Sequence, residues 1–403
     1  MKHLHLENIG PITIVDIDLK RYNIFIGPQS SGKSTIAKMI SFCTWIEKRA
    51  LTTLSEDVFS NEQEFIEHVE EYHKMHDYFN EKSVLEYNSQ NIHILYKDSK
   101  LSIKILDKTS YKRKKILYIP SDRNLVAMPR LDRLVLETNT NLRSFIFDWF
   151  DARGSYDKLH RLSILDLNME YYYDKDAKKV SQDRIIHTNG KTYDIALSDA
   201  SSGLQSITPL ALLLSYYTNQ YFADYGKTTS YKKDEEKKEL EEKIKSIYNR
   251  GIVSAIAGEN NTLSLLMQQN LYANLTTPSS SDFIIEEPEQ NLFPEAQESL
   301  LYWTIERIKD PERANSIVIT THSPYILFAL NNCLIGGLVG DKLESQALQS
   351  RKSWLRPSDV AVYEIHDGAL KSIQDEDGLL DNNYLNLAYK KISAEYMTML
   401  AQL

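Results

Sequence analysis

One octapeptide constrains the fold of this chain more than any other feature. Residues 27–34 read GPQSSGKS and match the pattern GxxxxGK, followed by Ser or Thr, at every fixed position. The apolar residues 23–26 (NIFI) precede it and are typical of a buried strand, and residues 35–40 (TIAKMI) follow it and are typical of a helix. The alternative is a glycine- and serine-rich surface turn, which would require neither a strand before it nor a helix after it. The octapeptide therefore predicts a phosphate-binding loop.

The residue types in this loop suit a nucleotide and its metal ion. Gly27 and Gly32 allow backbone angles that a Cβ atom disfavours, so successive N–H groups can turn toward a phosphate chain at a helix N-terminus. Lys33 adds a mobile positive charge, and Ser34 offers a hydroxyl to Mg²⁺, an ion that takes few protein ligands. We expect a nucleoside triphosphate and Mg²⁺ to bind here, and the loop alone does not say which nucleotide; ATP is what the resemblance described below implies. The residues predicted to contact nucleotide are Gly27, Pro28, Gln29, Ser30, Ser31, Gly32, Lys33, Ser34 and Thr35.

Composition limits the remaining possibilities. The 403 residues suffice for two or three folding units or for one large domain with insertions. The formal net charge of -9 means that nucleic acid or an anionic membrane would need a local basic patch. The two cysteines are far apart and predict neither a disulfide framework nor a zinc site. Because no signal peptide and no membrane-spanning stretch is recognised, we expect a cytoplasmic protein.

A second apolar run, residues 283–285 (FII), ends in two adjacent carboxylates, Glu286 and Glu287. Neighbouring residues of a strand point to opposite sides, so the two acids can have different tasks. We expect Glu286 to hold Mg²⁺, directly or through water, and Glu287 to act as the general base toward the attacking water.

Three further segments place polar groups at strand or helix ends. The run 316–320 (SIVIT) delivers Thr321 and His322, and we expect His322 to contact the γ-phosphate. Arg123 follows the apolar run 116–119 and the basic run 112–115, and it is a second candidate for the γ-phosphate; a surface salt bridge is the alternative. The turn 200–205 (ASSGLQ) precedes an apolar helix and offers N–H groups and Ser hydroxyls to phosphate.

In this order, the motifs resemble those of ABC-type ATPases of the SMC-like and overcoming-lysogenization-defect branch, over about residues 1–45 and 195–330. The resemblance implies that residues 27–34 are the Walker A loop, residues 283–287 the Walker B strand and His322 the switch histidine. It also implies that the turn 200–205 is the ABC signature, with Ser201 and Gly203 in the places of its Ser and second Gly. Two positions depart from the pattern: Glu286 stands where many ABC proteins have Asp, and no glutamine stands at the Q-loop position, where residues 118–123 form the equivalent segment.

The resemblance implies an α/β fold, a P-loop NTPase of ABC type with a mainly parallel sheet core, an N-terminal antiparallel β lobe and helical insertions. Local signals add a helix within 56–86, strands at 91–96 and 101–106, a hairpin at Asn189-Gly190, a strand at 360–365 and a helix at 384–400. The expected units are an N-terminal ATPase lobe (1–45 and 91–125), a helical insertion (46–90), a middle region (126–195), a C-terminal ATPase lobe (196–330) with a helical hairpin near 220–255, and a C-terminal strand–helix extension (331–403).

The same resemblance extends to the nucleotide-sensing subunits of bacterial anti-phage systems such as Septu and PARIS. It implies a homodimer or higher homo-oligomer that closes around ATP and controls an effector protein encoded nearby. The alternatives are an ATPase acting on DNA, either as part of a nuclease complex or as a DNA-bridging protein with long coiled-coil arms. The residues 375–377 (DED) have no preceding apolar strand, which disfavours a nuclease site, and long heptad repeats were not recognised.

Overall fold

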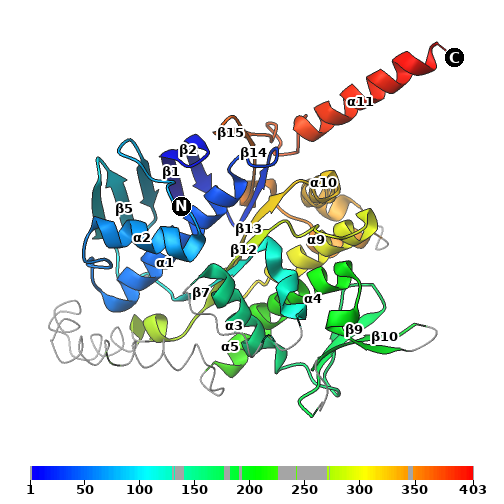
Figure 1. Cartoon of the computed structure of the whole chain (residues 1–403), viewed down its shortest axis with the longest axis horizontal. Helices are drawn as coiled ribbons and strands as arrows, with labels where there is room; N and C mark the ends of the chain where they lie inside the picture. Colours follow the sequence, from blue (N-terminus) through cyan, green and yellow to red (C-terminus); the bar gives the residue numbers. More distant parts are fainter. Residues whose placement is uncertain are drawn as a thin grey trace.

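The computed structural model describes residues 2–128, 131, 140–176, 182–189, 193–225, 242, 270–271, 273–343 and 348–402. Its centre is a sheet of eleven described strands with helices on both faces (Figure 1). Across the sheet the strands are β6 (Lys100–Ile105), β5 (Ile92–Lys97), β4 (Val84–Asn88), β1 (Lys2–Ile9), β2 (Ile12–Leu19), β15 (Ala369–Ser372), β14 (Val360–His366), β3 (Tyr22–Ile26), β13 (Ser316–Thr321), β12 (Ser280–Glu286) and β7 (Lys114–Ile119).

The five strands from β14 to β7 run parallel, and the strands β6, β5, β4, β1 and β2 pair antiparallel. The predicted α/β class, with a mainly parallel core and an N-terminal antiparallel lobe, is therefore confirmed. The two parts share one sheet because β15 pairs with both β14 and β2. Every residue of β3 and of β12 is buried, as expected for parallel strands covered on both faces.

Helices cover the two faces of the parallel strands. Ile284 and Val318 face the core that contains α1 (Lys33–Thr53) and α2 (Glu62–His73). Their neighbours in the strands face the other core, which contains the remaining helices of the body. These helices are α3 (Asn141–Arg153), α4 (Ser202–Ser215), α9 (Pro294–Ile308) and α10 (Pro324–Val339), and a π-helical turn (Tyr216–Gln220) joins α4 to α5 (Tyr221–Asp224).

The region 126–195 contains α3 and a small antiparallel sheet. Its strands are β8 (Leu162–Ser163), β9 (Met169–Tyr173), β10 (Asp183–His187) and β11 (Asp194–Ala196). Strands β10 and β11 pair on either side of the predicted Asn189-Gly190 turn, of which residues 190–192 lie outside the described part. The predicted helical hairpin near 220–255 also lies outside it, apart from residues 220–225 and 242.

Two expectations about organisation need correction. The segment 46–90, expected to be helical, also contains β4, because Leu85 and Tyr87 alternate with less buried residues and pair with β1. The segment 331–403 is more than an extension, since β14 lies inside the parallel sheet beside β3, with Val360 and Val362 fully buried. The predicted last helix is present as α11 (Tyr384–Leu400), and it projects from the body (Figure 1).

No helix within the described ranges combines the length and the apolar composition that a membrane span requires.

Candidate functional site

The phosphate loop joins the end of β3 to the start of α1. Gly32, the N-cap of α1, has φ 107°, a conformation that residues with a Cβ rarely adopt. No described side chain caps this helix, so its first N–H groups can meet an anion, and the helix dipole favours negative charge at this end. Gln29, Ser30 and Ser34 are exposed around this opening.

Lys33 folds back over the loop that it follows. Its Nζ donates hydrogen bonds to the carbonyl oxygens of Gly27 (2.9 Å) and Pro28 (2.7 Å). Burial lowers the pKa of this ammonium to about 8, and the nearby charges of Glu287 and Glu289 act in the opposite direction. Among the described residues, no carboxylate lies at hydrogen-bond distance from this ammonium, and a phosphate group would supply the opposite charge.

The two carboxylates predicted to form the Walker B motif, Glu286 and Glu287, lie at the end of β12, which pairs with β13 and β7. Glu286 is buried; its Oε2 accepts a long hydrogen bond from the backbone N–H of Ser121 (3.4 Å), and its Oε1 has no partner among the described residues. A buried carboxylate oxygen without a partner is costly, and a bound cation would remove that cost. Together with the exposed hydroxyl of Ser34, Glu286 fits the oxygen ligands of Mg²⁺.

Glu287 lies on the open side of the strand end, where it meets His322 from the neighbouring strand. His322 Nε2 is 2.9 Å from Glu287 Oε1, and both side chains are about one-third exposed. This hydrogen bond, more than any other influence, lowers the pKa of Glu287 and keeps it an ionised proton acceptor. The structure thus brings together the two residues predicted to act on the terminal phosphate.

Glu289 is a member of the site that sequence reasoning missed. Its Oε1 accepts hydrogen bonds from the backbone N–H of His322 (2.7 Å) and from Thr321 Oγ1 (2.8 Å), and its Oε2 is buried without a partner among the described residues. Burial raises the pKa of this carboxyl. The available signal was its position in the sequence, two residues beyond Glu287 and after Pro288, but this position alone does not indicate a contact with the strand that precedes His322.

Arg123 does not lie where the sequence placed it. The side chain is fully buried, and its guanidinium donates to backbone carbonyls: Nε to Ser206 (3.0 Å), Nη1 to Glu286 (2.8 Å) and Nη2 to Glu287 (2.7 Å). Longer bonds reach Pro120 and Pro288. Both earlier interpretations, a γ-phosphate contact and a surface salt bridge, are therefore corrected: Arg123 ties the loop after β12 to α4. Burial lowers its pKa to about 10, so it stays charged at neutral pH.

The signature turn lies at the N-terminus of α4. Ser201 caps this helix by accepting a hydrogen bond from Leu204 N–H (3.4 Å), and it is exposed. A Cβ atom at Gly203 would lie 2.9 Å from the carbonyl oxygen of Asn291, so the turn packs closely on the loop that follows Glu287. Helix α4 packs on the face of the sheet opposite α1. The signature turn and the phosphate loop therefore belong to opposite layers of one subunit.

The acidic segment 375–377 is a turn rather than a metal site. Asp375 Oδ1 accepts the backbone N–H groups of Asp377 (3.0 Å) and Leu379 (2.8 Å), so this carboxylate stabilises its own loop.

Comparison with known proteins gives one family match and several structural matches. Residues 264–327, which include β12, β13 and the switch histidine, match the family model described as "AAA domain, putative AbiEii toxin, Type IV TA system". No curated protein matches the chain. The SMC head domain from Thermotoga maritima is similar at 11% identity, with 93% of this chain and 98% of that chain covered and a TM-score of 0.40.

Two further solved structures are similar at the same level. The Smc head domain with an extended coiled coil derived from Pyrococcus furiosus, bound to the C-terminal domain of ScpA, shares 9% identity, with 98% and 100% of the two chains covered and a TM-score of 0.42. The recombination mediator protein RecF shares 11% identity, with 92% and 97% covered and a TM-score of 0.33.

The position of Arg123 predicts a large effect on stability. Arg123→Met should lower the free energy of unfolding by about 3 kcal/mol, because the substitution leaves several buried carbonyls without a donor. Denaturant unfolding of the two proteins measures this difference. Arg161→Met is the matched control. Arg161 is partly exposed and makes a long ion pair with Glu170 (3.4 Å), so its loss should change stability little. Equal losses in the two variants would contradict the structural role of Arg123.

The lowered pKa of Lys33 predicts a pH-dependent affinity for ATP. Above a pKa of about 8 the free protein loses this proton, and phosphate binding must restore it, so affinity should fall from about pH 7.5 to about pH 9. Calorimetry in buffers with different ionisation enthalpies should detect proton uptake over this interval. Lys33→Arg, whose guanidinium stays charged, should show no such uptake; identical uptake in both proteins would assign the proton to another group.

Proposed function

We propose that this chain binds and hydrolyses ATP, that two copies close around the nucleotide, and that the closed state controls an effector protein in anti-phage defence. One observation carries the ATPase part of the proposal. The uncapped N-terminus of α1 with Lys33, the buried Glu286 and the Glu287–His322 pair all follow the ends of the adjacent parallel strands β3, β12 and β13, and Glu286 Oε1 has no partner among the described residues. These are the groups that phosphoryl transfer to water requires.

Each group has a defined part in binding. The N–H groups at the start of α1 and the Lys33 ammonium would hold the phosphates, and Ser34 Oγ and Glu286 Oε1 would hold Mg²⁺. When bound, Mg²⁺ neutralises part of the charge on the phosphate oxygens. Because Lys33 Nζ now lies on the carbonyls of Gly27 and Pro28, it has to exchange these hydrogen bonds for phosphate oxygens.

In this proposal, Glu287 and His322 carry out the chemical step. Water adds to the terminal phosphorus, the bond to the bridging oxygen breaks, and the water proton passes to a carboxylate oxygen of Glu287, which leaves ADP and phosphate. His322 holds the Glu287 carboxylate through Nε2 and thereby favours its ionised form. His322 is itself held by Glu289 through its backbone N–H.

The proposed dimer uses the two layers of the subunit. Because α1 and α4 pack on opposite faces of the sheet, Ser201 of one copy would complete the site of a second copy related by a two-fold axis. The γ-phosphate would then favour the closed dimer through contacts that ADP lacks. The proposed role in defence rests on the sequence resemblance, and the match of residues 264–327 to a family described by a toxin of a toxin–antitoxin system supports it.

Two substitutions separate binding from turnover. Lys33→Ala should abolish ATP binding, since the loop loses its mobile cation. Glu287→Gln should bind ATP with near-normal affinity but release phosphate roughly 100-fold more slowly or worse, because the proton acceptor is lost while the phosphate and metal ligands remain. Calorimetry and phosphate release measure the two quantities. Normal turnover by Glu287→Gln would remove this residue from the role of base.

A mixing experiment tests the shared site. Lys33→Ala and Ser201→Arg should each be inactive alone, but a mixed dimer joins the intact loop of the second protein to the intact signature of the first and restores one site. Phosphate release should therefore return on mixing. Each mixed dimer should have one active site, about half the number in the unmodified dimer. If subunit exchange were shown by fluorescence transfer and no activity returned, the two-copy site would have to be abandoned.

A further inference from the structure

Helix α11 carries its apolar side chains into solvent. None of its described residues is buried, and the helix extends away from the sheet and the other helices (Figure 1). Tyr389 is 73% exposed and Ile392 is 68% exposed, so most of each side chain is in contact with solvent. The large apolar residues of α11 that are exposed are Leu387, Tyr389, Ile392, Tyr396, Met397, Met399 and Leu400. Such a concentration on one short element marks an interaction surface.

Some of the apolar residues follow the spacing of a coiled-coil seam, while Leu387, Met397 and Leu400 lie off it. Leu385, Tyr389, Ile392, Tyr396 and Met399 are separated by four, three, four and three positions. This is the a/d pattern of a heptad repeat, which places one stripe along a helix that packs against a second helix with the same period. Sequence reasoning considered only long coiled coils and missed this two-heptad seam.

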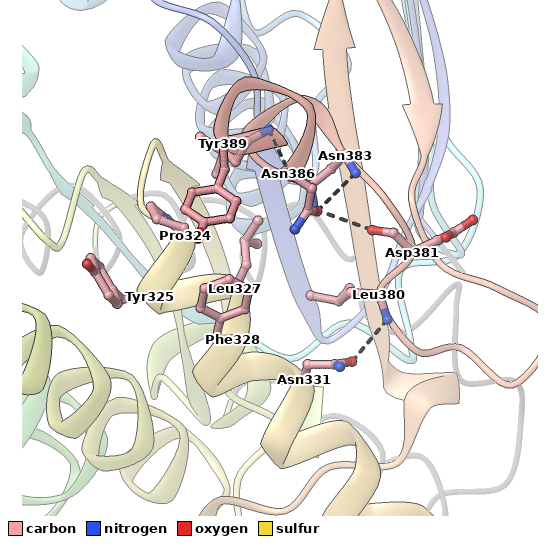
Figure 2. Close-up of a pocket in the computed structure, with 11 residues that line it drawn as sticks. Pro324, Tyr325, Leu327, Phe328, Asn331, Leu380, Asp381, Asn383, Asn386 and Tyr389 are labelled. Carbon is pink, nitrogen blue, oxygen red and sulfur yellow. Dashed lines mark hydrogen bonds between the residues drawn. The ribbon is translucent and has the colours of Figure 1, made fainter. Parts of the chain in front are cut away.

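The start of α11 is fixed to the body. Asn383 and Asn386 form a reciprocal cap, and the backbone N–H of Tyr384 donates to Glu364 Oε2 on β14 (3.0 Å). The preceding segment is held by a hydrogen bond from Leu380 N–H to Asn331 Oδ1 on α10 (3.0 Å), which Figure 2 shows. Because these contacts set the direction of α11, little orientational freedom is lost when its seam meets a partner.

The apolar surface continues from α11 onto α10. A pocket of about 380 Å³ lies between the two helices, with Leu327 and Phe328 on one side and Tyr389 on the other (Figure 2). Leu385 also lines this pocket. Phe328 is 57% exposed and Tyr325, just after the switch histidine segment, is 44% exposed. The seam and this pocket form one continuous surface.

We infer that α11 pairs with α11 of a second copy of this chain, seam against seam, without any need for nucleotide. A second copy supplies the partner that the spacing requires: a helix of equal length, with the same a/d residues, related by a two-fold axis. The basic residues Lys390 and Lys391 lie at heptad positions b and c, off the seam, so like charges do not meet across it.

The exposed apolar area of α10 and α11 is large enough for an interface with a second copy. Each exposed aromatic or aliphatic side chain contributes on the order of 100 Å², so α11 and the α10 face offer roughly 800 Å² per copy, which is the size of a standard interface. The pairing also differs from closure around ATP, since α11 contains none of the residues assigned to nucleotide.

The test measures the mass of the full-length chain in solution without nucleotide, by sedimentation over a range of concentrations. The unmodified chain should be a dimer or larger. Ile392→Glu combined with Tyr396→Glu places acids on the seam and should weaken association at least 100-fold. Ala394→Glu combined with Thr398→Glu places the same charges on the outer face of the same helix, at positions f and c, and should leave association unchanged. At a concentration low enough for all three proteins to be monomeric, thermal unfolding should be equal, because α11 contributes no buried residue to the single chain.

The test of α11 pairing can be separated from the test of the proposed function. Lys33→Ala, which should not bind ATP, should still associate through α11, and the seam variant should still bind ATP. The inference is overturned if the unmodified chain is a monomer at all concentrations, if the seam and outer-face variants associate equally well, or if a monomeric chain retains a different polypeptide through α11.

Discussion

The buried guanidinium of Arg123 is the interaction on which the geometry of the candidate site depends. Arg123 lies in the segment that follows β7. Its guanidinium donates to carbonyls of the loop after β12 and of α4. A buried cation is tolerated there because several carbonyl oxygens point at it and because the charges of Glu289, Glu287 and Glu286 oppose the lowering of its pKa. It joins the helix of the signature turn to the backbone of the proposed base, so movement of either has to be accommodated by the other.

The backbone at Glu287 shows why such a clamp is needed. Glu287 has φ 43°, a left-handed conformation that costs a residue with a Cβ about 1 kcal/mol or more. The conformation is held from two sides, because the Glu287 N–H donates to Thr320 (2.9 Å) and its carbonyl accepts from Arg123. This turn aims the Glu287 side chain at His322, while Glu286, one residue earlier, stays buried near Ser121. The two acids therefore differ in environment as well as in position.

Sequence reasoning found the parts of the site that depend on local order. The phosphate loop, the acids after β12 and the histidine after β13 each follow an apolar run, and the parallel pairing of these runs brings their ends together. It failed where a contact depends on residues distant in the chain. Arg123 reads as a strand-end polar group until the carbonyl of Ser206 is known to lie beside it. In the same way, β14 reads as an extension because its partner β3 is more than 300 residues away, and β4 was hidden in a polar segment that pairs with β1.

The most direct measurement of the central claim is a crystal structure of Glu287→Gln with ATP and Mg²⁺. The account predicts the triphosphate at the N-terminus of α1, with Lys33 moved from its carbonyl partners onto phosphate oxygens. It also predicts Mg²⁺ on Ser34 and Glu286, and Ser201 of a second copy at the γ-phosphate. Nucleotide bound elsewhere, or a γ-phosphate enclosed entirely by residues of its own subunit, would contradict it.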